Sequence, residues 1–564
     1  MGDESVTNVR HLTLGTAGHI DHGKTTLVEA LTGKNTDRLR EERERGISIE
    51  LGYAPLELPD GRLLSVIDVP GHERFVRTMV AGATGIDLFL LVIDAAEGAR
   101  PQTNEHLEIL RLLGIDCGVV AVTKADAVDD ETLDLAVEEA RELVPTAEVV
   151  PVSARTGVGI ETLRAALAAA AERVEPTALR DRPTRLYVDR AFTLRGIGTV
   201  VTGTLWSGSI AEGDELQVQP TGRVVRIRSV QVHDETVGRA SAGQRVAVSL
   251  PGVERSGVRR GDVVVAPDAY PSSYRLDVAL DASRELPPIA QVHHGTSAVA
   301  ARVVRLGERY AQLRLVAPVV AARGDRVVLR AQTTIGGGRV IDPAPPRHAD
   351  AARIELLDRG DVAATIHEPA EAAQLRHVLD GEPVGVDRVE GWLYSRAWLD
   401  ELRAQLDARL AEADPLDPGV PEPAERWAPA IVPLLGLERR GGKLYRRGAA
   451  ASLGAREAEA AELEAKLGLE PVKVDPALAR LLEEQGRLVR VGDGLAVSRA
   501  AYDDARAKLV AEVEAAGRIT LPRFRDLVGT GRKTAQLLLE RLDADGVTRR
   551  VGDERVLRRG ARTS

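Results

Sequence analysis

Hydrophobic and polar positions follow three different patterns along the 564 residues of the chain. In the first part, short runs that are almost entirely apolar alternate with longer segments that have one apolar face. This alternation predicts a parallel β-sheet with helices on both faces. The expected strands are residues 12–16, 64–68, 88–94, 119–123 and 149–152, and the expected helices are residues 25–31, 102–113, 131–143 and 160–171.

After a polar connector that contains proline, at residues 176–183, the pattern changes to β-runs interrupted by glycine turns. Glycine turns at this density are typical of antiparallel barrels. We therefore expect an α/β domain over residues 1–175, a first barrel over residues 180–266 and a second barrel over residues 270–343.

The last third is rich in helix-forming residues and repeats itself. Residues 486–493 recur as 546–553, and residues 391–397 recur as 494–500. Each repeat joins helices to a hairpin that turns at glycine, which predicts an array of winged-helix domains. Their expected bounds are 345–398, 399–449, 450–500 and 501–564.

Composition limits where the protein works. A formal net charge of −10 argues against a chain that binds nucleic acid over its whole surface. The single cysteine, Cys117, cannot form an internal disulfide, which fits a reducing compartment. No signal peptide is evident, and the longest apolar run, residues 88–96, is too short to span a bilayer. We expect a cytoplasmic monomer that makes no membrane contact.

Residues 18–25 fit the phosphate-binding pattern G-x-x-x-x-G-K-[ST], between an expected strand and an expected helix. Backbone N–H groups of such a loop bind phosphate oxygens, and the lysine reaches the β- and γ-phosphates. Thr25 is then a predicted Mg²⁺ ligand. The expected nucleotide-binding residues of this loop are Gly18, Asp21, His22, Gly23, Lys24, Thr25 and Thr26.

Two further segments follow in the order that a nucleotide switch requires. Residues 45–49 resemble a switch segment whose hydroxyl, on Ser48, completes the Mg²⁺ shell when a γ-phosphate is present. Asp68 ends a β-run, as an acidic residue near Mg²⁺ should, and the backbone N–H of Gly71 is placed to reach the γ-phosphate. His72 is the candidate catalytic residue, because it can orient the attacking water.

The base pocket is expected after the next two strands. An acidic residue at Asp126 can accept hydrogen bonds from guanine N1–H and its 2-amino group, a donor pair that adenine lacks. We therefore predict GTP and GDP as the nucleotides. The residues assigned to this pocket are Thr123, Lys124, Asp126, Ser153, Ala154 and Arg155.

With these motifs in place, residues 12–174 resemble the G domain of a translational GTPase such as elongation factor Tu, which makes the fold class a P-loop GTPase domain followed by β-barrels and winged helices. The sequence departs from that pattern twice. Elongation factor Tu has threonine where Ser48 stands and asparagine where Thr123 stands. Serine retains the hydroxyl for Mg²⁺. We expect the loss of the amide at Thr123 to favour spontaneous exchange of GDP, which stopped-flow release measurements test.

Residues 189–192 and 242–245 resemble segments of the selenocysteine-specific elongation factor family, SelB. The resemblance implies that Asp189, Arg190 and Arg245 line a pocket for a selenocysteinyl group. A selenol is an anion at neutral pH, so paired guanidinium groups can select it over neutral serine. The alternative is that Asp189 and Arg190 form only a salt bridge at a strand end.

The C-terminal end is basic: residues 518–562 hold twelve basic and six acidic side chains, a net charge of +6. In the last winged helix, residues 532–545 are the expected recognition helix. The resemblance to SelB implies that this domain binds an mRNA hairpin, whereas the alternative is a solvated arginine-rich surface. The candidate RNA contacts are Arg523, Arg525, Arg532, Lys533, Arg549 and Arg550.

The resemblance to SelB thus implies a GTPase that delivers selenocysteinyl-tRNA to the ribosome at recoded UGA codons. Two rival functions stay open. One is a general or initiation-type GTPase that delivers tRNA, against which the winged helices and the arginine pocket argue. The other is a GTP-switched DNA-binding regulator, because winged helices commonly bind DNA; the paired barrels argue against it.

Overall fold

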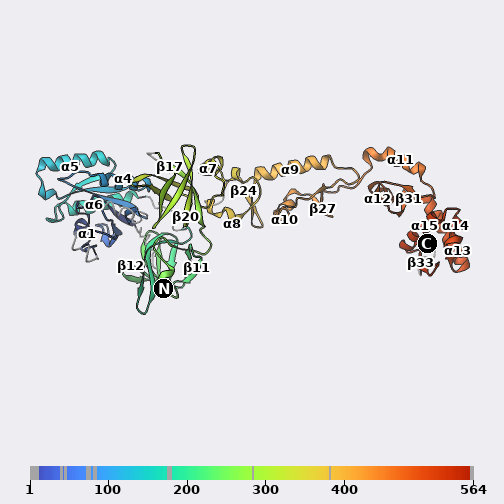
Figure 1. The fold of residues 1–564 in the computed structure, drawn as a ribbon, viewed down its shortest axis with the longest axis horizontal. Coiled ribbons are helices and arrows are strands. Elements are labelled where there is room, and N and C mark those ends of the chain that lie inside the picture. The colour runs from blue at the N-terminus through green and yellow to red at the C-terminus, as the bar shows by residue number, and fades with distance from the viewer. Residues whose placement is uncertain are drawn as a thin grey trace. The chain divides into compact units, whose positions relative to one another are not determined.

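The computed structural model of the protein describes residues 12–37, 42, 48–71, 78–80, 85–174, 181–281, 285–379 and 383–558. The chain forms two compact units (Figure 1). The first contains residues 1–365 with 373–384, and the second contains residues 366–372 with 385–564. Within the described ranges, no helix combines the length and the apolar character needed to cross a membrane.

The first domain is an α/β sheet in the order β2-β3-β1-β4-β5-β6. Its strands are β1 (Leu12–Gly18), β2 (Gly52–Glu57), β3 (Leu63–Asp68), β4 (Leu88–Asp94), β5 (Gly118–Thr123) and β6 (Glu148–Pro151). The five strands that the sequence predicted are all present and parallel. Strand β2 was not predicted; it adds an antiparallel edge by pairing with β3.

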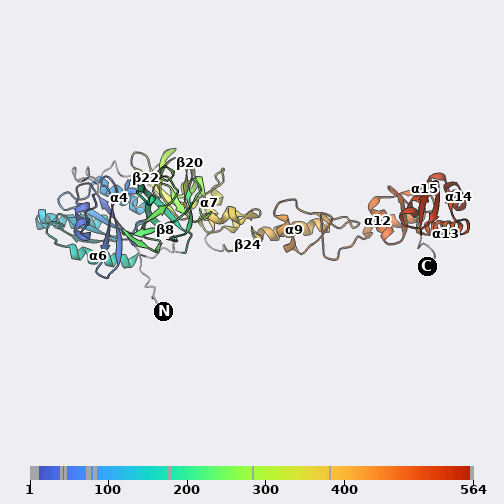
Figure 2. The ribbon, with the colours of Figure 1, turned by 90° about the horizontal axis from the view of Figure 1, so that it is seen from below.

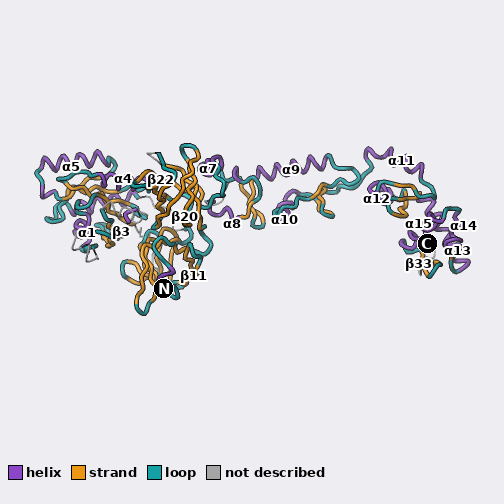
Figure 3. Tube along the Cα trace, viewed as in Figure 1, coloured by secondary structure: helices purple, strands orange, loops and turns teal. Residues whose placement is uncertain are grey.

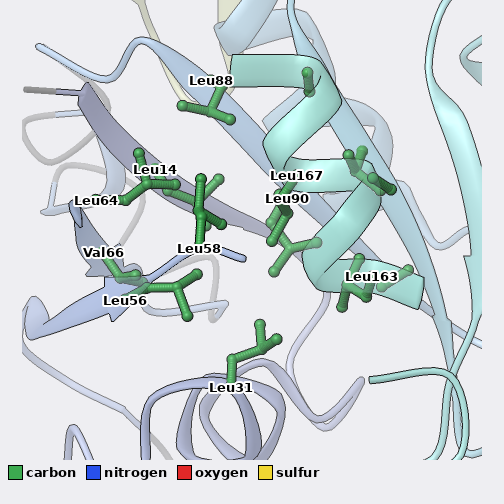
Figure 4. Close-up of a cluster of buried hydrophobic side chains, with 14 of the residues drawn as sticks. Leu14, Leu31, Leu56, Leu58, Leu64, Val66, Leu88, Leu90, Leu163 and Leu167 are labelled. Atoms are coloured by element: carbon green, nitrogen blue, oxygen red, sulfur yellow. The ribbon is translucent and has the colours of Figure 1, made fainter. Parts of the chain in front are cut away.

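Successive side chains of the buried strands point to opposite faces, so each strand serves two cores. On β4, Leu88 and Leu90 join the core under α1 (Lys24–Thr32) and α6 (Ile160–Arg173), which Figure 4 shows in part. Phe89 and Leu91 join the core under α4 (Pro101–Leu112) and α5 (Asp130–Leu143). Burial on both faces explains why these strands are almost entirely apolar.

The second domain wraps β-strands around one apolar core. Its main sheet has the order β11-β10-β16-β7-β8-β15-β12-β13, and β9 and β14 form a separate ribbon. The strands are β7 (Arg185–Leu194), β8 (Gly198–Ser207), β9 (Ser209–Ala211), β10 (Glu215–Gln219), β11 (Arg223–Arg226), β12 (Val230–Val232), β13 (Glu235–Val237), β14 (Arg239–Ser241), β15 (Arg245–Leu250) and β16 (Val263–Val265).

The third domain is a closed barrel in the order β17-β20-β19-β18-β21-β22. Figure 2 labels two of its strands, β20 and β22. Its strands are β17 (Ser272–Asp281), β18 (Ile289–His294), β19 (Ser297–Leu306), β20 (Tyr310–Val320), β21 (Arg326–Arg330) and β22 (Thr334–Asp342). Helix α7 (Ala351–Asp358) follows the barrel and packs on it, because Arg353 pairs with the buried Asp342 at 2.6 Å.

The second unit contains four small antiparallel sheets, each made of a short strand and a hairpin, as an array of winged helices requires (Figure 3). The strands are β23 (Ala370–Glu371), β24 (Val386–Val389), β25 (Trp392–Ser395), β26 (Val420–Pro421), β27 (Glu438–Arg440), β28 (Lys443–Tyr445), β29 (Val472–Lys473), β30 (Leu488–Gly492), β31 (Leu495–Ser498), β32 (Ile519–Thr520), β33 (Thr548–Val551) and β34 (Glu554–Leu557). The helices of this unit are α9 (Arg396–Ala411), α10 (Ala428–Ile431), α11 (Glu457–Lys466), α12 (Pro476–Glu484), α13 (Arg499–Ala516), α14 (Leu521–Val528) and α15 (Arg532–Ala544). Helix α8 (Ala372–Leu375) begins at the last residue of the 366–372 segment, and its other residues belong to the first unit.

A buried ion pair joins the second and third domains. Arg185, 1% exposed, donates to both carboxylate oxygens of Asp325, at 2.5 and 2.9 Å. Its guanidinium also lies over the rings of Tyr187, Trp206 and Tyr270 at 5.0–5.5 Å. Burial acts to raise the pKa of Asp325, but Arg185 outweighs it and holds the pKa below its ordinary value. The two β-domains therefore pack as one body.

We expect Arg185→Ala to lower the free energy of unfolding of these β-domains by about 3–5 kcal/mol, because it leaves a carboxylate buried without its cation. Chemical denaturation followed by tryptophan fluorescence measures the change. As a control, Arg326→Ala removes the exposed partner of Asp281, 2.7 Å away, and should cost less than about 1 kcal/mol. Equal losses in the two variants would contradict this account.

Candidate functional site

The phosphate loop lies between β1 and α1 and has an unusual backbone. Gly18, Asp21 and Gly23 have positive φ angles of 130°, 62° and 82°. Glycine adopts positive φ angles without steric cost, and aspartate is one of the few other residues that tolerate the left-handed region. A Cβ atom on Gly18 would lie 2.3 Å from the carbonyl oxygen of Val92. Gly23 caps α1 without a side-chain hydrogen bond. The first N–H groups of α1 are therefore available to an anion.

Lys24 is 7% exposed and donates to the carbonyl oxygens of Gly18 and His19, at 3.1 and 2.6 Å. Burial lowers the pKa of Lys24 to about 8, although Asp68 and Asp21 act to raise it. A phosphate beside the ammonium group would offset the cost of burying its charge. The phosphate carries a full negative charge, whereas the backbone carbonyls supply only partial charges.

The three predicted metal ligands lie together. Thr25 donates its hydroxyl hydrogen to Asp68 at 2.8 Å, and its Oγ1 lies 2.9 Å from the Oγ of Ser48. Asp68 also accepts from the hydroxyls of Thr16 and Thr36, both at 2.8 Å. All of these donor atoms are oxygens, the ligands that Mg²⁺ prefers. The residues therefore fit a Mg²⁺ ion bound together with nucleotide phosphates.

Gly71 lies close to the phosphate loop. A Cβ atom there would lie 2.3 Å from the Nζ atom of Lys24 and 2.8 Å from the backbone nitrogen of Ile20, so only glycine fits without a shift. The adjacent His72, the candidate catalytic residue, lies outside the described residues, as do residues 45–47 of the predicted switch.

The predicted base-pocket residues converge after β5 and β6. Hydrogen bonds from Ser153 and then Arg155 lower the pKa of Asp126, so the carboxylate is ionised and can accept from guanine. Arg155 donates to it through Nε at 2.9 Å. Lys124 has a φ of 57° and pairs with Asp94 at 2.6 Å. Ala154 lies between Ser153 and Arg155 in the same turn.

Thr123 ties this pocket to the phosphate loop. Its hydroxyl donates to the carbonyl oxygens of His22, at 2.7 Å, and Ile93, at 3.2 Å. The hydroxyl therefore connects the end of β5 to the backbone of the phosphate loop and to β4. Thr26, in contrast, is exposed on the first turn of α1.

Sequence reasoning missed His106, on α4. Its Nδ1 accepts a hydrogen bond from the backbone N–H of Gly18 at 3.1 Å. Burial lowers the pKa of His106 to about 3, so the ring is neutral and can accept. The neighbouring Glu105 accepts from Thr334 of the barrel and pairs with Arg330 at 3.2 Å. In the sequence, the only indication of this role was a histidine within the expected helix 102–113.

The candidate aminoacyl residues surround Tyr53 of β2. Asp189 accepts from Arg245 at 3.0 Å, from Thr202 at 2.6 Å and from the Tyr53 hydroxyl at 3.1 Å. The Arg245 guanidinium lies 3.5 Å from the centroid of the Tyr53 ring. Asp189 thus pairs with Arg245 and not with its neighbour Arg190, contrary to the alternative raised from the sequence.

Arg190 contacts the first domain. It donates to the carbonyl oxygen of Leu51 at 2.7 Å and pairs with Glu50 at 3.0 Å. Both arginines line a cavity of about 510 Å³ between the first and second domains. The cavity wall also includes Phe192, Thr202 and His233. Tyr53 could not be assigned to this wall from the sequence, because it lies 136 residues from Asp189 along the chain.

The six predicted RNA contacts of the last winged helix fall into two groups, those paired with an acidic residue and those exposed. Arg523 pairs with Glu512 at 2.8 Å and Arg525 pairs with Asp526 at 2.7 Å. The other four are exposed, two at the start of α15 and two on β33: Arg532, Lys533, Arg549 and Arg550.

Another stripe of α15 packs against the preceding winged helix. Thr534 donates to Glu470 at 2.6 Å, and Arg541 pairs with Glu483 at 3.2 Å. The start of α15 and the β33–β34 hairpin therefore present exposed cations that this contact leaves uncovered.

Models of known families match four parts of the chain: the elongation factor Tu GTP-binding domain over residues 9–173, elongation factor Tu domain 2 over residues 198–265, the β-barrel domain of selenocysteine-specific elongation factor over residues 273–347, and the winged helix of elongation factor SelB over residues 511–557.

Whole-chain comparisons agree with these matches. A selenocysteine-specific elongation factor of Desulfomicrobium baculatum is 35% identical, over 97% of this chain and 99% of that protein. The protein of that description from Escherichia coli K12 is 40% identical over 59% of this chain and 56% of its own. The crystal structure of a bacterial selenocysteine-specific elongation factor, EF-Sec, covers 98% of this chain and 100% of its own, with a TM-score of 0.70 and 28% identity.

We expect Thr123→Val to accelerate release of GDP by about fivefold, because it removes a buried hydrogen bond worth about 1 kcal/mol to the phosphate loop. Stopped-flow release of a fluorescent GDP measures the rate. Thr123→Ser, which keeps the hydroxyl, is the matched control and should release GDP at nearly the original rate. Identical rates for Val and Ser would contradict the role of the hydroxyl.

Proposed function

The chain belongs to the selenocysteine-specific elongation factors, and on that premise we propose that it carries selenocysteinyl-tRNA to the ribosome at UGA codons marked by an mRNA hairpin. It is a GTP-dependent translation factor and a GTPase. The observation that carries the proposal is the pair of guanidinium groups, Arg190 and Arg245, in a cavity between the GTP-binding domain and the second domain.

Nucleotide binding follows from the loop geometry. Backbone N–H groups at the start of α1 meet the phosphates, and Lys24 adds a positive charge beside the β- and γ-phosphates. Asp126 accepts from guanine, with Ser153 and Arg155 holding its carboxylate. Thr25 and Ser48 would hold Mg²⁺ beside Asp68, and a bound Mg²⁺ would neutralise phosphate charge. GTP-dependent ordering of the segment around Ser48 then reports the state of the nucleotide.

The aminoacyl cavity distinguishes aminoacyl groups by the charge of their side chains. A selenolate brought to Arg190 and Arg245 gains two charge-assisted contacts. A neutral serine hydroxyl adds no negative charge to that of Glu50 and Asp189, the carboxylates with which the two arginines already pair. Asp189 and Tyr53 orient Arg245, through a carboxylate and an aromatic face respectively. Segment 50–53 of the GTP-binding domain thus contacts both arginines, which links the cargo site to the domain that binds GTP.

The fourth winged helix is the proposed site for the mRNA hairpin. Its exposed cations at the start of α15 and on β33 suit contacts to phosphates, which position a ligand without reading its sequence. If this domain bound duplex DNA in preference to an RNA hairpin, the chain would fit the rival function of a regulator.

Binding of the full chain to selenocysteinyl-tRNA and seryl-tRNA, each with GTP and with GDP, tests the central proposal. We expect tight binding only for selenocysteinyl-tRNA with GTP. Arg245→Ala should reduce the preference for selenocysteine by at least tenfold, because one guanidinium is lost from the charge-reading pair. Equal affinity of the unaltered chain for both tRNAs would favour a general tRNA-delivering GTPase.

We expect His72→Ala to keep GTP affinity within about twofold and to lose most ribosome-stimulated hydrolysis. The reason is that the histidine orients water and takes no part in binding the nucleotide. Single-turnover hydrolysis with saturating ribosomes measures the effect, and His72→Gln provides a side chain that can still orient water. Full stimulation in the alanine variant would remove His72 from the mechanism.

A further inference from the structure

The hairpins of the four winged helices can be compared position by position, because they share one cross-strand pair. In each hairpin an arginine of the first strand lies opposite an apolar residue of the second strand. The pairs are Arg388–Leu393, Arg439–Leu444, Arg490–Ala496 and Arg549–Val556.

Aligned on this pair, the four hairpins differ in charge. Residues 386–397 of the first have a net charge of 0, and residues 488–500 of the third have +1. Residues 437–448 of the second have +4, and residues 547–560 of the fourth have +3. The rest of the second winged helix, residues 399–436, has a net charge of −5, so its cations are concentrated in the hairpin 437–448, here called the second wing.

The second and fourth hairpins also share an arrangement of cations. Next to the common pair, Arg440 lies opposite Lys443 in the second, and Arg550 lies opposite Arg555 in the fourth, whereas the first has an apolar pair there. Lys443 and Arg555 are each held by an aspartate of their own domain, at 2.5 and 3.0 Å. Like charges directly opposite across a sheet are destabilising, so both arrangements favour an added anion.

Two exposed arginines precede the turn of the second wing. Arg439 pairs with Glu422 at 2.6 Å, and Arg440 pairs with Glu438. Both arginine side chains are 49% exposed. Ion pairs at such an exposure contribute only about 0–1 kcal/mol each, so a phosphate can replace these carboxylates at little cost.

Two further exposed arginines follow the turn. Arg446 donates to the carbonyl oxygen of Asp407 at 3.1 Å, and the carboxylate of that residue is 3.9 Å away. Arg447 donates to the carbonyl oxygen of Gly436 at 3.1 Å. In the first and third hairpins, a serine that caps the next helix takes the place of Arg446. Basic residues at both positions therefore distinguish the second wing from those two hairpins.

The second wing is held firmly on its domain. Leu444 is fully buried, and the Tyr445 hydroxyl donates at 3.0 Å to Asp417, which also binds Lys443. The guanidinium of Arg440 lies 5.0 Å from the centroid of the Tyr445 ring. A ligand of this hairpin would therefore pay little for ordering it.

We propose that the second wing binds backbone phosphates of ribosomal RNA through Arg439, Arg440, Arg446 and Arg447. The choice of RNA rests on the proposed function, which brings three RNAs together. The fourth winged helix is assigned to the mRNA hairpin and the cavity to the aminoacyl end of the tRNA, which leaves ribosomal RNA for the second wing. Guanidinium groups bind phosphate oxygens in pairs, and such contacts position a protein without reading sequence.

The test measures binding of the GTP-loaded full chain to salt-washed ribosomes that carry neither mRNA nor tRNA, at several salt concentrations. For the double variant Arg439→Ala and Arg447→Ala, the slope of log K against log salt should become shallower by about 1.5, because each lost phosphate contact removes about 0.7–0.9. Affinity at the lowest salt concentration should fall by roughly tenfold or more. Affinities for the free mRNA hairpin and for selenocysteinyl-tRNA should stay unchanged.

The matched control is Arg388→Ala with Arg396→Ala, at the equivalent positions of the first hairpin. It also removes two positive charges and one exposed ion pair, since Arg396 pairs with Asp387 at 2.8 Å. We expect it to leave the slope unchanged. If the alanine variant of the second wing loses GTP binding, Arg439→Gln with Arg447→Gln replaces it. An unaltered slope in a variant that binds GTP overturns the proposal.

A second measurement separates ribosomal RNA from ribosomal protein. An iron chelate attached to Ala450→Cys, an exposed position just beyond the second wing, generates hydroxyl radicals there; Cys117→Ala removes the other thiol. We expect cleavage of ribosomal RNA that the double variant abolishes. Absence of cleavage, or an effect of the double variant confined to the mRNA hairpin or the tRNA, overturns the proposal and leaves the proposed function standing. Failure of the unaltered chain to bind selenocysteinyl-tRNA overturns the proposed function instead.

Discussion

The carboxylate of Asp68 is the interaction on which the GTP-binding domain depends. It is 1% exposed, and hydroxyl groups from three different segments donate to it. Thr16 lies on β1, Thr25 at the start of α1, and Thr36 beyond the end of that helix. A buried carboxylate is tolerated only when its lone pairs are satisfied, so these segments are held together by one charge. The phosphate loop keeps its shape within this arrangement.

Helix α4 connects the phosphate loop with the third domain. Two adjacent residues of this helix contact different domains. His106 accepts a hydrogen bond from the backbone N–H of Gly18, and Glu105 binds Thr334 and Arg330 of the third-domain barrel. A rigid helix lets a displacement at one end of this chain of contacts reach the other. The second and third domains are themselves joined by the Arg185–Asp325 pair. Each of the three domains of the first unit is therefore bound to a neighbour by a polar contact, which restricts their relative motion.

Local patterns could be predicted from the sequence, and long-range contacts could not. The phosphate loop, the five parallel strands and the hairpin repeats depend on residues that are close in sequence, so spacing was sufficient to find them. Strand β2 was missed because it is an edge strand with mixed burial, and its pairing with β3 is a tertiary preference. The roles of Tyr53 and His106 depend on partners more than 80 residues away, which periodicity cannot reveal.

The contact along α15 has a mechanical consequence. The last two winged helices share one apolar core, in which Val489 and Val491 lie with Leu538 and Leu539. Polar contacts from Glu470 and Glu483 border that core. A transcript that pulled on the terminal domain while the ribosome advanced would therefore load both domains together. The last two winged helices would then move as one rigid body. Rotation of this pair relative to the rest of the chain would have to occur at residues that precede the third winged helix.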